Sequence, residues 1–300
     1  MNQFRTIQRI LLLMTGVSLL CTTCSPLPQG PTAADILGNP NYQAISYGGY
    51  RAITRDTIPS VDQIKDDMRI LSAIDVKILR TYNTELAELP NLLKAISELK
   101  QEDSSFEMYV MVGAWINCKD AWTDHPDHTQ EDEAYNEAEV QRAVQYAKQY
   151  PDIIKMIAIG NEAMVHWATS YFVSPSVILK WVNYLQELKS KGELPSDLWI
   201  TSSDDFAAWG GASDNYHTED LNRLIAAVDF VSMHTYAFHN SHYSPDYWYS
   251  RDPSLSKIEQ IDASMQRAGE FAIGQYNDVK QYILSLGIDK PVHIGETGWA

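Results

Sequence analysis

The chain has 300 residues, of which 45% are hydrophobic, and this length can bury one large core. It carries 39 acidic residues against 23 basic ones, a formal net charge of -16 at pH 7. Such an acidic surface repels nucleic acid and anionic polymers, so a neutral polymer is the compatible partner. We expect a monomer that needs no cofactor.

The N-terminus has the pattern of an export signal over residues 1–23. Arg5 and Arg9 precede an apolar run, Ile10 to Leu20, that is too short to span a bilayer. The following Cys-Thr-Thr-Cys-Ser resembles a bacterial lipoprotein cleavage site, with Cys24 favoured over Cys21 as the lipidated residue because two small residues precede it. The expected location is the bacterial cell envelope, in the periplasm or on the outer-membrane surface. An ordinary secretory signal with incidental cysteines is the alternative.

Residues 24–43 are rich in proline and glycine, which predicts a lipid-anchored tether that is not itself folded. The folded domain is therefore expected over residues 44–300. If Cys24 is lipidated, Cys118 has no cysteine to pair with, so no disulfide framework is expected in this domain. Its stability then has to come from the hydrophobic core.

Beyond residue 43, short apolar strands alternate with amphipathic helices. Between the first two strands, Ser60 and Gln63 have the spacing of a capping box, and the helix they begin has apolar residues on one face. Seven strands are predicted in all: Ala44 to Arg51, Lys77 to Asn83, Phe106 to Asn117, a strand that ends at Glu162, Trp199 to Asp205, Phe230 to Phe238, and a strand that ends at Glu296.

Seven strand and helix steps in this order predict an α/β fold of the TIM (β/α)8 barrel type, which closes with eight strands and takes about 250 residues. No eighth strand follows the seventh, and two unpaired parallel edges would be a poor outcome for an exported protein. We therefore expect the natural chain to continue beyond residue 300. An open doubly wound sheet is disfavoured because no glycine-rich phosphate loop opens its first helix.

In such barrels the active site lies at the C-terminal ends of the strands. The residues predicted there are acids, amides and aromatics, a mixture typical of sugar-binding sites because aromatic faces stack on pyranose rings while amides and carboxylates bind hydroxyls. The candidate site residues are Tyr47, Arg80, Tyr82, Trp115, Asn161, Glu162, His234, Tyr236, Glu296 and Trp299.

Two of the strand ends have the same pattern, apolar residues followed by glycine and glutamate. They are Gly-Asn-Glu-Ala at residues 160–163 and Gly-Glu-Thr-Gly-Trp at residues 295–299. Together with Ile-Leu-Arg-Thr-Tyr at 78–82, these motifs resemble glycoside hydrolase family 17, the β-1,3-glucanase group of the retaining barrel glycosidases. The resemblance covers almost all of the expected domain.

This resemblance implies that Glu162 is the general acid/base and Glu296 the nucleophile of a retaining hydrolase of β-1,3-glucan. Asn161 would then bind the sugar 2-hydroxyl. From residue type and position, Tyr236 is expected to orient Glu296, Arg80 to keep a carboxylate ionised, and Trp115 and Trp299 to offer stacking surfaces. Arg80 could equally brace the barrel rim, and His234 could be a core histidine.

Two other functions remain open. A transglycosylase would differ only in that a sugar, and not water, resolves the covalent intermediate. A non-catalytic glycan-binding lipoprotein would keep a sugar-binding groove without catalysing a reaction. No metal site is expected, since the His125/His128 and His239/His242 pairs lie in loops. The acidic run from Glu131 to Glu139 is interpreted as a solvated face.

Overall fold

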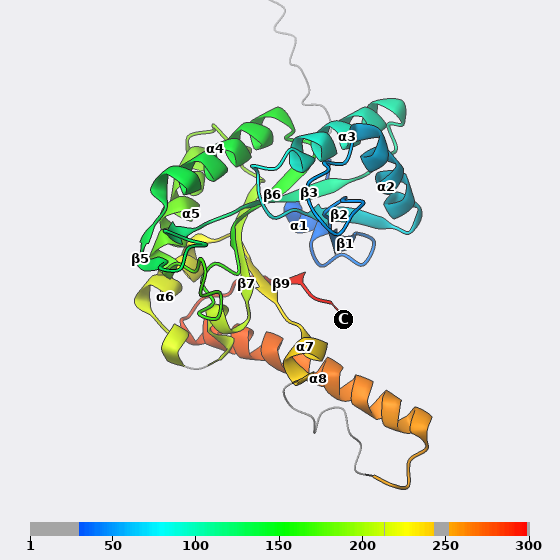
Figure 1. Cartoon of the computed structure of the whole chain (residues 1–300), viewed down its shortest axis with the longest axis vertical. Helices are drawn as coiled ribbons and strands as arrows, with labels where there is room; N and C mark the ends of the chain where they lie inside the picture. The colour runs from blue at the N-terminus through cyan, green and yellow to red at the C-terminus, as the bar shows by residue number, and fades with distance from the viewer. Residues whose placement is uncertain (1–29, 213, 243–251, 299–300) are drawn as a thin grey trace, which may run out of the picture.

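The computed structural model describes residues 30–212, 214–242 and 252–298 (Figure 1). The predicted signal, both candidate lipidation cysteines, Cys21 and Cys24, and the stacking candidate Trp299 lie outside these residues. Within the described residues, no helix is long and apolar enough to cross a membrane.

Seven parallel strands form one sheet that curls into a nearly closed barrel (Figure 1). Their order is β1-β2-β3-β6-β7-β8-β9, so each strand pairs with its neighbours in chain order. The bounds are β1 Gln43–Ser46, β2 Val76–Arg80, β3 Tyr109–Ala114, β6 Ile154–Asn161, β7 Trp199–Asp205, β8 Val231–His234 and β9 Val292–Glu296. The predicted barrel class is confirmed.

Helices connect successive strands and cover the outside of the sheet (Figure 1). The capping box predicted at Ser60 and Gln63 is present, each side chain accepting a hydrogen bond from the backbone N–H of the other. The helices after β1 are α2 Val61–Ala73, α3 Glu88–Glu102, α4 Glu133–Gln149, α5 Pro175–Ser190, α6 Glu219–Ala227, the short α7 Ala237–His242 and the long α8 Lys257–Ser285.

The main core lies between the sheet and these helices. All six residues of β3 and the first seven of β6 are buried, as continuous apolar runs require in strands covered on both faces. A second, smaller core fills the barrel near the N-terminal ends of the strands, where Met156 and Phe230 are almost fully buried. The two cores hold the strands rigidly on both faces.

Part of the segment expected to be an unfolded tether is folded. Residues Ala33–Ile36 form a short helix, α1, whose Ala33 and Ile36 are fully buried in the smaller core. A capping box between Thr32 and Asp35 begins this helix. Two apolar residues in a proline-rich segment were too weak a signal to predict it. The tether prediction is therefore wrong for this part of residues 24–43, and α1 closes the bottom of the barrel.

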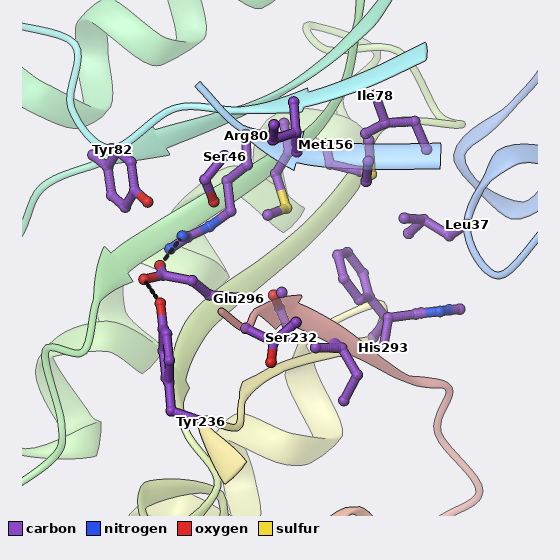
Figure 2. A pocket seen from close by; sticks show the side chains of 17 residues that line it. Leu37, Ser46, Ile78, Arg80, Tyr82, Met156, Ser232, Tyr236, His293 and Glu296 are labelled. Carbon is purple, nitrogen blue, oxygen red and sulfur yellow. Dashed lines mark hydrogen bonds and ion pairs between the residues drawn. The ribbon is translucent and has the colours of Figure 1, made fainter. Parts of the chain in front are cut away.

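The described sheet has seven of the eight strands that close such a barrel, and β1 and β9 form its two edges. Ile45 on β1 is 44% exposed and Ile294 on β9 is 45% exposed. A cavity of about 340 Å³ lies between these strands and continues up to the end of β9 (Figure 2). The edges thus present apolar side chains where a further strand would cover them.

The insertion after β3 contains structure that the sequence analysis did not predict. The short strands β4 (Cys118–Lys119) and β5 (Asp127–Glu131) pair antiparallel. The acidic run that follows is not a solvated face throughout, because Glu139 is fully buried. Its carboxylate accepts hydrogen bonds from the backbone N–H groups of Thr84 and Trp115 and pairs with Arg142. That carboxylate ties the ends of β2 and β3 to α4.

Candidate active site

The chain turns sharply at the end of β6, where the motif Gly-Asn-Glu lies. Gly160 has φ 84°, and a Cβ there would lie 2.8 Å from the Cβ of Ala163, so glycine is required. Glu162 itself has φ 47°, a left-handed conformation that is rare for a residue with a side chain. Its N–H donates to the carbonyl oxygen of Ser203 on β7, at 2.9 Å. The turn therefore fixes where the Glu162 carboxyl group points.

The second motif depends on a close approach of β9 to β8. A Cβ on Gly295 would lie 2.0 Å from Oγ of Ser232 and 2.7 Å from Oγ of Ser203, so only glycine fits there. Because this residue has no side chain, β9 can pack against the serines inside the barrel, and Glu296 follows at the strand end.

Glu296 is held from two sides (Figure 2). The guanidinium group of Arg80 donates to one carboxylate oxygen and the Tyr236 hydroxyl donates to the other. Arg80 also donates to Oδ1 of Asn161, and its guanidinium carbon lies 4.8 Å from the ring centroid of Tyr82. Only 5% of the Arg80 side chain is exposed, so its charge is poorly screened by solvent. Arg80 thus links β2, β6 and β9 at one point.

His234, at the end of β8, lies between the two glutamates. Its Nδ1 is 3.0 Å from Oε1 of Glu162 and 3.9 Å from Oε2 of Glu296, so these two oxygens are no more than about 7 Å apart. On the other side of the ring, Nε2 is 2.7 Å from Oγ of Ser203. The His234 side chain is fully buried. Glu162 lies 72 positions before His234 in the chain and Glu296 lies 62 positions after it, yet both approach the same imidazole ring.

Below about pH 7 the two carboxyl groups have different protonation states. Burial, and then the negative charge of Glu296, raise the pKa of Glu162 to about 7. Burial also opposes ionisation of Glu296, but the positive charge of Arg80 and the hydrogen bonds from Tyr236 and Arg80 outweigh it and lower its pKa. Burial and Arg80 lower the pKa of His234 to about 3, so the imidazole is neutral and the lasting positive charge is that of Arg80.

Asp204, at the end of β7, positions the loop that follows Glu162. The Asp204 side chain is fully buried, and its carboxylate accepts hydrogen bonds from the N–H of Met164 at 2.7 Å and of Asp205 at 2.8 Å. Burial raises the pKa of Asp204, and burial raises that of Asp205 to about 6. The sequence places both aspartates at a strand end but indicates no role for them. Ser203, which bonds to His234, carries no signal in the sequence at all.

Not every predicted site residue joins this cluster. Tyr47 is 8% exposed and donates its hydroxyl hydrogen to Asp67, at 2.7 Å, so it packs beside α2. Trp115 is half-buried, and its indole N–H donates to Oδ1 of Asn117. The cluster brings together Arg80, Tyr82, Asn161, Glu162, His234, Tyr236 and Glu296.

The histidine pairs do not all lie in loops as predicted, because His128 belongs to β5 and His239 and His242 belong to α7. Nδ1 of His128 lies 2.8 Å from the carbonyl oxygen of Phe172, and its ring stacks on that of Phe172 with centroids 3.7 Å apart. Across residues 30–212, 214–242 and 252–298, no group of three or more His, Cys, Asp or Glu is placed to hold a metal ion.

A protonated and an ionised carboxyl group, facing one neutral imidazole at the C-terminal ends of parallel barrel strands, define a glycoside hydrolase of the α/β-barrel class. A scan against protein families matches residues 44–300 to the BtgE/BtgC glycoside hydrolase domain. The chain belongs to this family and is an enzyme, a glycosidase. Comparison with curated proteins finds no match.

One solved structure with high sequence identity has the same fold. The chain is similar to the crystal structure of an endo-laminarinase from Formosa Hel1_33_131, with 59% sequence identity and a TM-score of 0.88, over 90% of this chain and 69% of that one. It also matches one of two plant beta-glucan endohydrolases of distinct substrate specificities, with 13% identity and a TM-score of 0.44, over 86% of this chain and 77% of that one.

Proposed function

We propose that the protein hydrolyses β-1,3-glucan with retention of anomeric configuration. The observation that carries this proposal is the grouping of Glu162 and Glu296 around His234, with one carboxyl group protonated and the other ionised. Retaining glycosidases place two carboxyl groups about 5 to 5.5 Å apart, whereas inverting enzymes leave about 6.5 to 9.5 Å for a water molecule. The upper limit of about 7 Å between the two oxygens is compatible with the shorter spacing and excludes most of the longer range.

In the first step the ionised Glu296 attacks the anomeric carbon, while Glu162 donates its proton to the departing glycosidic oxygen. In the second step the ionised Glu162 takes a proton from water, which displaces Glu296 from the sugar. Arg80 and Tyr236 hold Glu296 in place for the attack. Because Oδ1 of Asn161 accepts from Arg80, the amide offers its N–H group to the sugar 2-hydroxyl.

Two observations support a β-1,3 linkage. The motifs around Asn161, Glu162 and Glu296 resemble those of glycoside hydrolase family 17, in which we place the chain. The structure with 59% identity is that of an endo-laminarinase, and laminarin is a β-1,3-glucan. A sugar that replaces water in the second step would give transfer instead, and the same glycosyl-enzyme serves both reactions.

The purified protein should release reducing sugar from laminarin, and far less from β-1,4-glucan, β-1,6-glucan or mannan. Proton NMR during the first minutes of laminari-oligosaccharide cleavage should show the β-anomer as the first product, since two displacements restore the configuration. Products longer than the substrate at high oligosaccharide concentration would reveal transfer. A first product in the α form would refute retention, and cleavage of mannan alone would refute the β-1,3-glucan assignment.

We further propose that the enzyme is a lipoprotein of the bacterial envelope, anchored through Cys24. This rests on the sequence around Cys24, because the structure does not describe these residues. In a bacterial host fed radiolabelled palmitate, the wild-type chain should carry label and sediment with membranes, whereas Cys24→Ser should be unlabelled. Cys21→Ser is the matched control and should keep the label. Loss of label in Cys21→Ser but not in Cys24→Ser would assign the lipid to Cys21. Absence of label from the wild-type chain would refute the lipid anchor.

A further inference from the structure

Two tryptophans of the segment after β3 form an aromatic cluster with Tyr171, which lies between β6 and α5. Trp122 stacks on Tyr171 with ring centroids 4.9 Å apart and planes 22° from parallel, and Trp115 packs against the same tyrosine at 5.0 Å. Tyr171 is 7% exposed, whereas Trp122 is 60% exposed. One face of the Trp122 ring is therefore supported, and the side chain remains largely open to solvent.

The indole N–H groups of both tryptophans are already used inside the protein. Each donates to Oδ1 of Asn117, from Trp115 at 2.9 Å and from Trp122 at 3.2 Å. Asn117 is itself buried, and its backbone exchanges two hydrogen bonds with the Asn136 side chain. What Trp122 offers to a ligand is thus its ring face. An aromatic face binds the C–H surface of a pyranose ring.

The backbone holds Trp122 in a costly conformation. Its φ is 64°, and Asp120 in the same loop has φ 55°, a region that bulky residues rarely occupy. The Trp122 N–H donates to the carbonyl oxygen of Ser170, at 2.9 Å, which keeps the loop in this shape. Strained residues of this kind cluster at ligand-binding sites, where the strain positions a side chain in advance.

This cluster lies on the Glu162 side of the active site. The segment that supports it follows Glu162 in the chain and returns beside it, with the N–H of Val173 donating to the carbonyl oxygen of Ala163 at 2.7 Å. The Tyr171 backbone is bonded to Cys118 at 3.0 Å. After burial, the nearby charge of Glu162 is the largest contribution to the raised pKa of Tyr171. By contrast, Glu296 is held from β2 and β8.

We propose that the exposed face of Trp122, supported by Tyr171, is a subsite that stacks a glucosyl unit on the leaving-group side of the scissile bond. The proposal rests on the proposed function, because it takes Glu162 as the acid that protonates the leaving oxygen. A sugar that departs toward Glu162 lies next to the loop that Trp122 occupies. The same subsite would hold the acceptor sugar when transfer replaces hydrolysis.

The test compares laminarihexaose with β-laminaribiosyl fluoride, whose leaving group is too small to reach the subsite. For Trp122→Leu, which keeps apolar bulk but removes the aromatic face, kcat/KM on the hexaose should fall about tenfold, or ~1.4 kcal/mol of transition-state binding. Activity on the fluoride should stay within about twofold of the wild type. Trp122→Phe, which keeps an aromatic face, should retain most activity on the hexaose.

Glycine variants separate the ring from the backbone strain. Trp122→Gly should unfold at the wild-type temperature or above, because glycine accepts a positive φ, yet lose hexaose activity like the leucine variant. Asp120→Gly is the matched control and should relieve strain while leaving hexaose cleavage within about twofold.

Wild-type hexaose activity in Trp122→Leu would overturn the subsite while leaving the proposed function intact. An equal loss on the hexaose and the fluoride would overturn the leaving-group assignment. Absence of cleavage by the wild-type enzyme would instead refute the proposed function.

Discussion

Replacing Glu296 by glutamine is expected to lower kcat on laminarin by on the order of 10⁴-fold or more, because an amide cannot form the covalent bond to the sugar. The amide oxygen can still accept a hydrogen bond from Arg80 or Tyr236, so the variant should keep its fold. Circular dichroism and the unfolding temperature check this. Glu107→Gln is the matched control, since Glu107 is also paired, with Lys77 at 2.8 Å, but precedes β3 at the opposite end of the barrel. It should keep wild-type activity.

Chemical rescue identifies which face of the sugar Glu296 attacks. In Glu296→Gly the space left by the side chain admits azide, which should displace an activated leaving group from the α face and yield the α-glycosyl azide. NMR of the product gives its configuration. A β-glycosyl azide from this variant, or residual activity within tenfold of the wild type in Glu296→Gln, would contradict the assignment of Glu296 as nucleophile.

Much of the fold followed from the sequence because parallel strands covered on both faces leave a continuous apolar signal. The strand Trp199–Asp205 was predicted with the same bounds that the structure has. The last strand also ends at Glu296 as predicted. The predicted ends of the remaining strands ran on, as in Phe106 to Asn117, where the structure ends β3 at Ala114. Two of the extra residues there, Trp115 and Ile116, are apolar, but they pack in the loop after the strand, and the local sequence pattern does not distinguish a loop from a strand.

The site was predictable where a motif imposes geometry. Gly160 and Gly295 each precede a residue of the carboxyl cluster and are required by a turn and by a close strand contact, so the Gly-Asn-Glu and Gly-Glu patterns mark real backbone constraints. Tyr47 had the right type at the right strand end, yet its hydroxyl is bonded to Asp67, a residue of α2. Asp67 lies 20 residues further along the chain, and no local sequence pattern predicts this hydrogen bond.

Residues that act through tertiary contacts were not predictable. Ser203 touches His234 only because β7 and β8 pair in one register, and a serine in a strand has no special pattern. Trp122 lies in a polar insertion for which the sequence predicted no structure, and its contact partner Tyr171 follows β5, α4 and β6 in the chain. Glu139 was interpreted as solvated because its neighbours in sequence are acidic, whereas the backbone N–H groups that bind it come from two other elements.

Replacing Glu162 by glutamine is expected to lower kcat/KM on laminarin by about 10² to 10⁴-fold, because the glycosidic oxygen loses its proton donor. The loss should nearly disappear in the first turnover of β-laminaribiosyl fluoride, whose leaving group needs no proton. Stopped-flow measurement of that turnover separates formation of the glycosyl-enzyme from its hydrolysis. Hydrolysis should stay slow, because the variant lacks the base that activates water. Azide should accelerate breakdown in Glu162→Gly and give the β-glycosyl azide, the opposite configuration to that expected from Glu296→Gly.

The pH dependence of kcat/KM provides an independent check on the same residue. The proposed mechanism needs Glu162 protonated and Glu296 ionised, so the wild-type profile should be bell-shaped. As pH rises through about 7, the pKa of Glu162, the acid is lost and activity should fall. As pH falls below the ordinary glutamate pKa, Glu296 becomes protonated, and because its pKa is lowered this decline should begin late. In Glu162→Gln the alkaline decline should be absent from the remaining activity, since glutamine does not titrate.

Glu88 makes this check specific to Glu162. Burial raises the pKa of Glu88 to about 7 as well, and it lies at the start of α3 without contributing to the carboxyl pair. Glu88→Gln should therefore keep both the activity and the alkaline decline of the wild type. If that decline persisted in Glu162→Gln and vanished in Glu88→Gln, the titrating acid would be Glu88, and the assignment of Glu162 as proton donor would have to be abandoned.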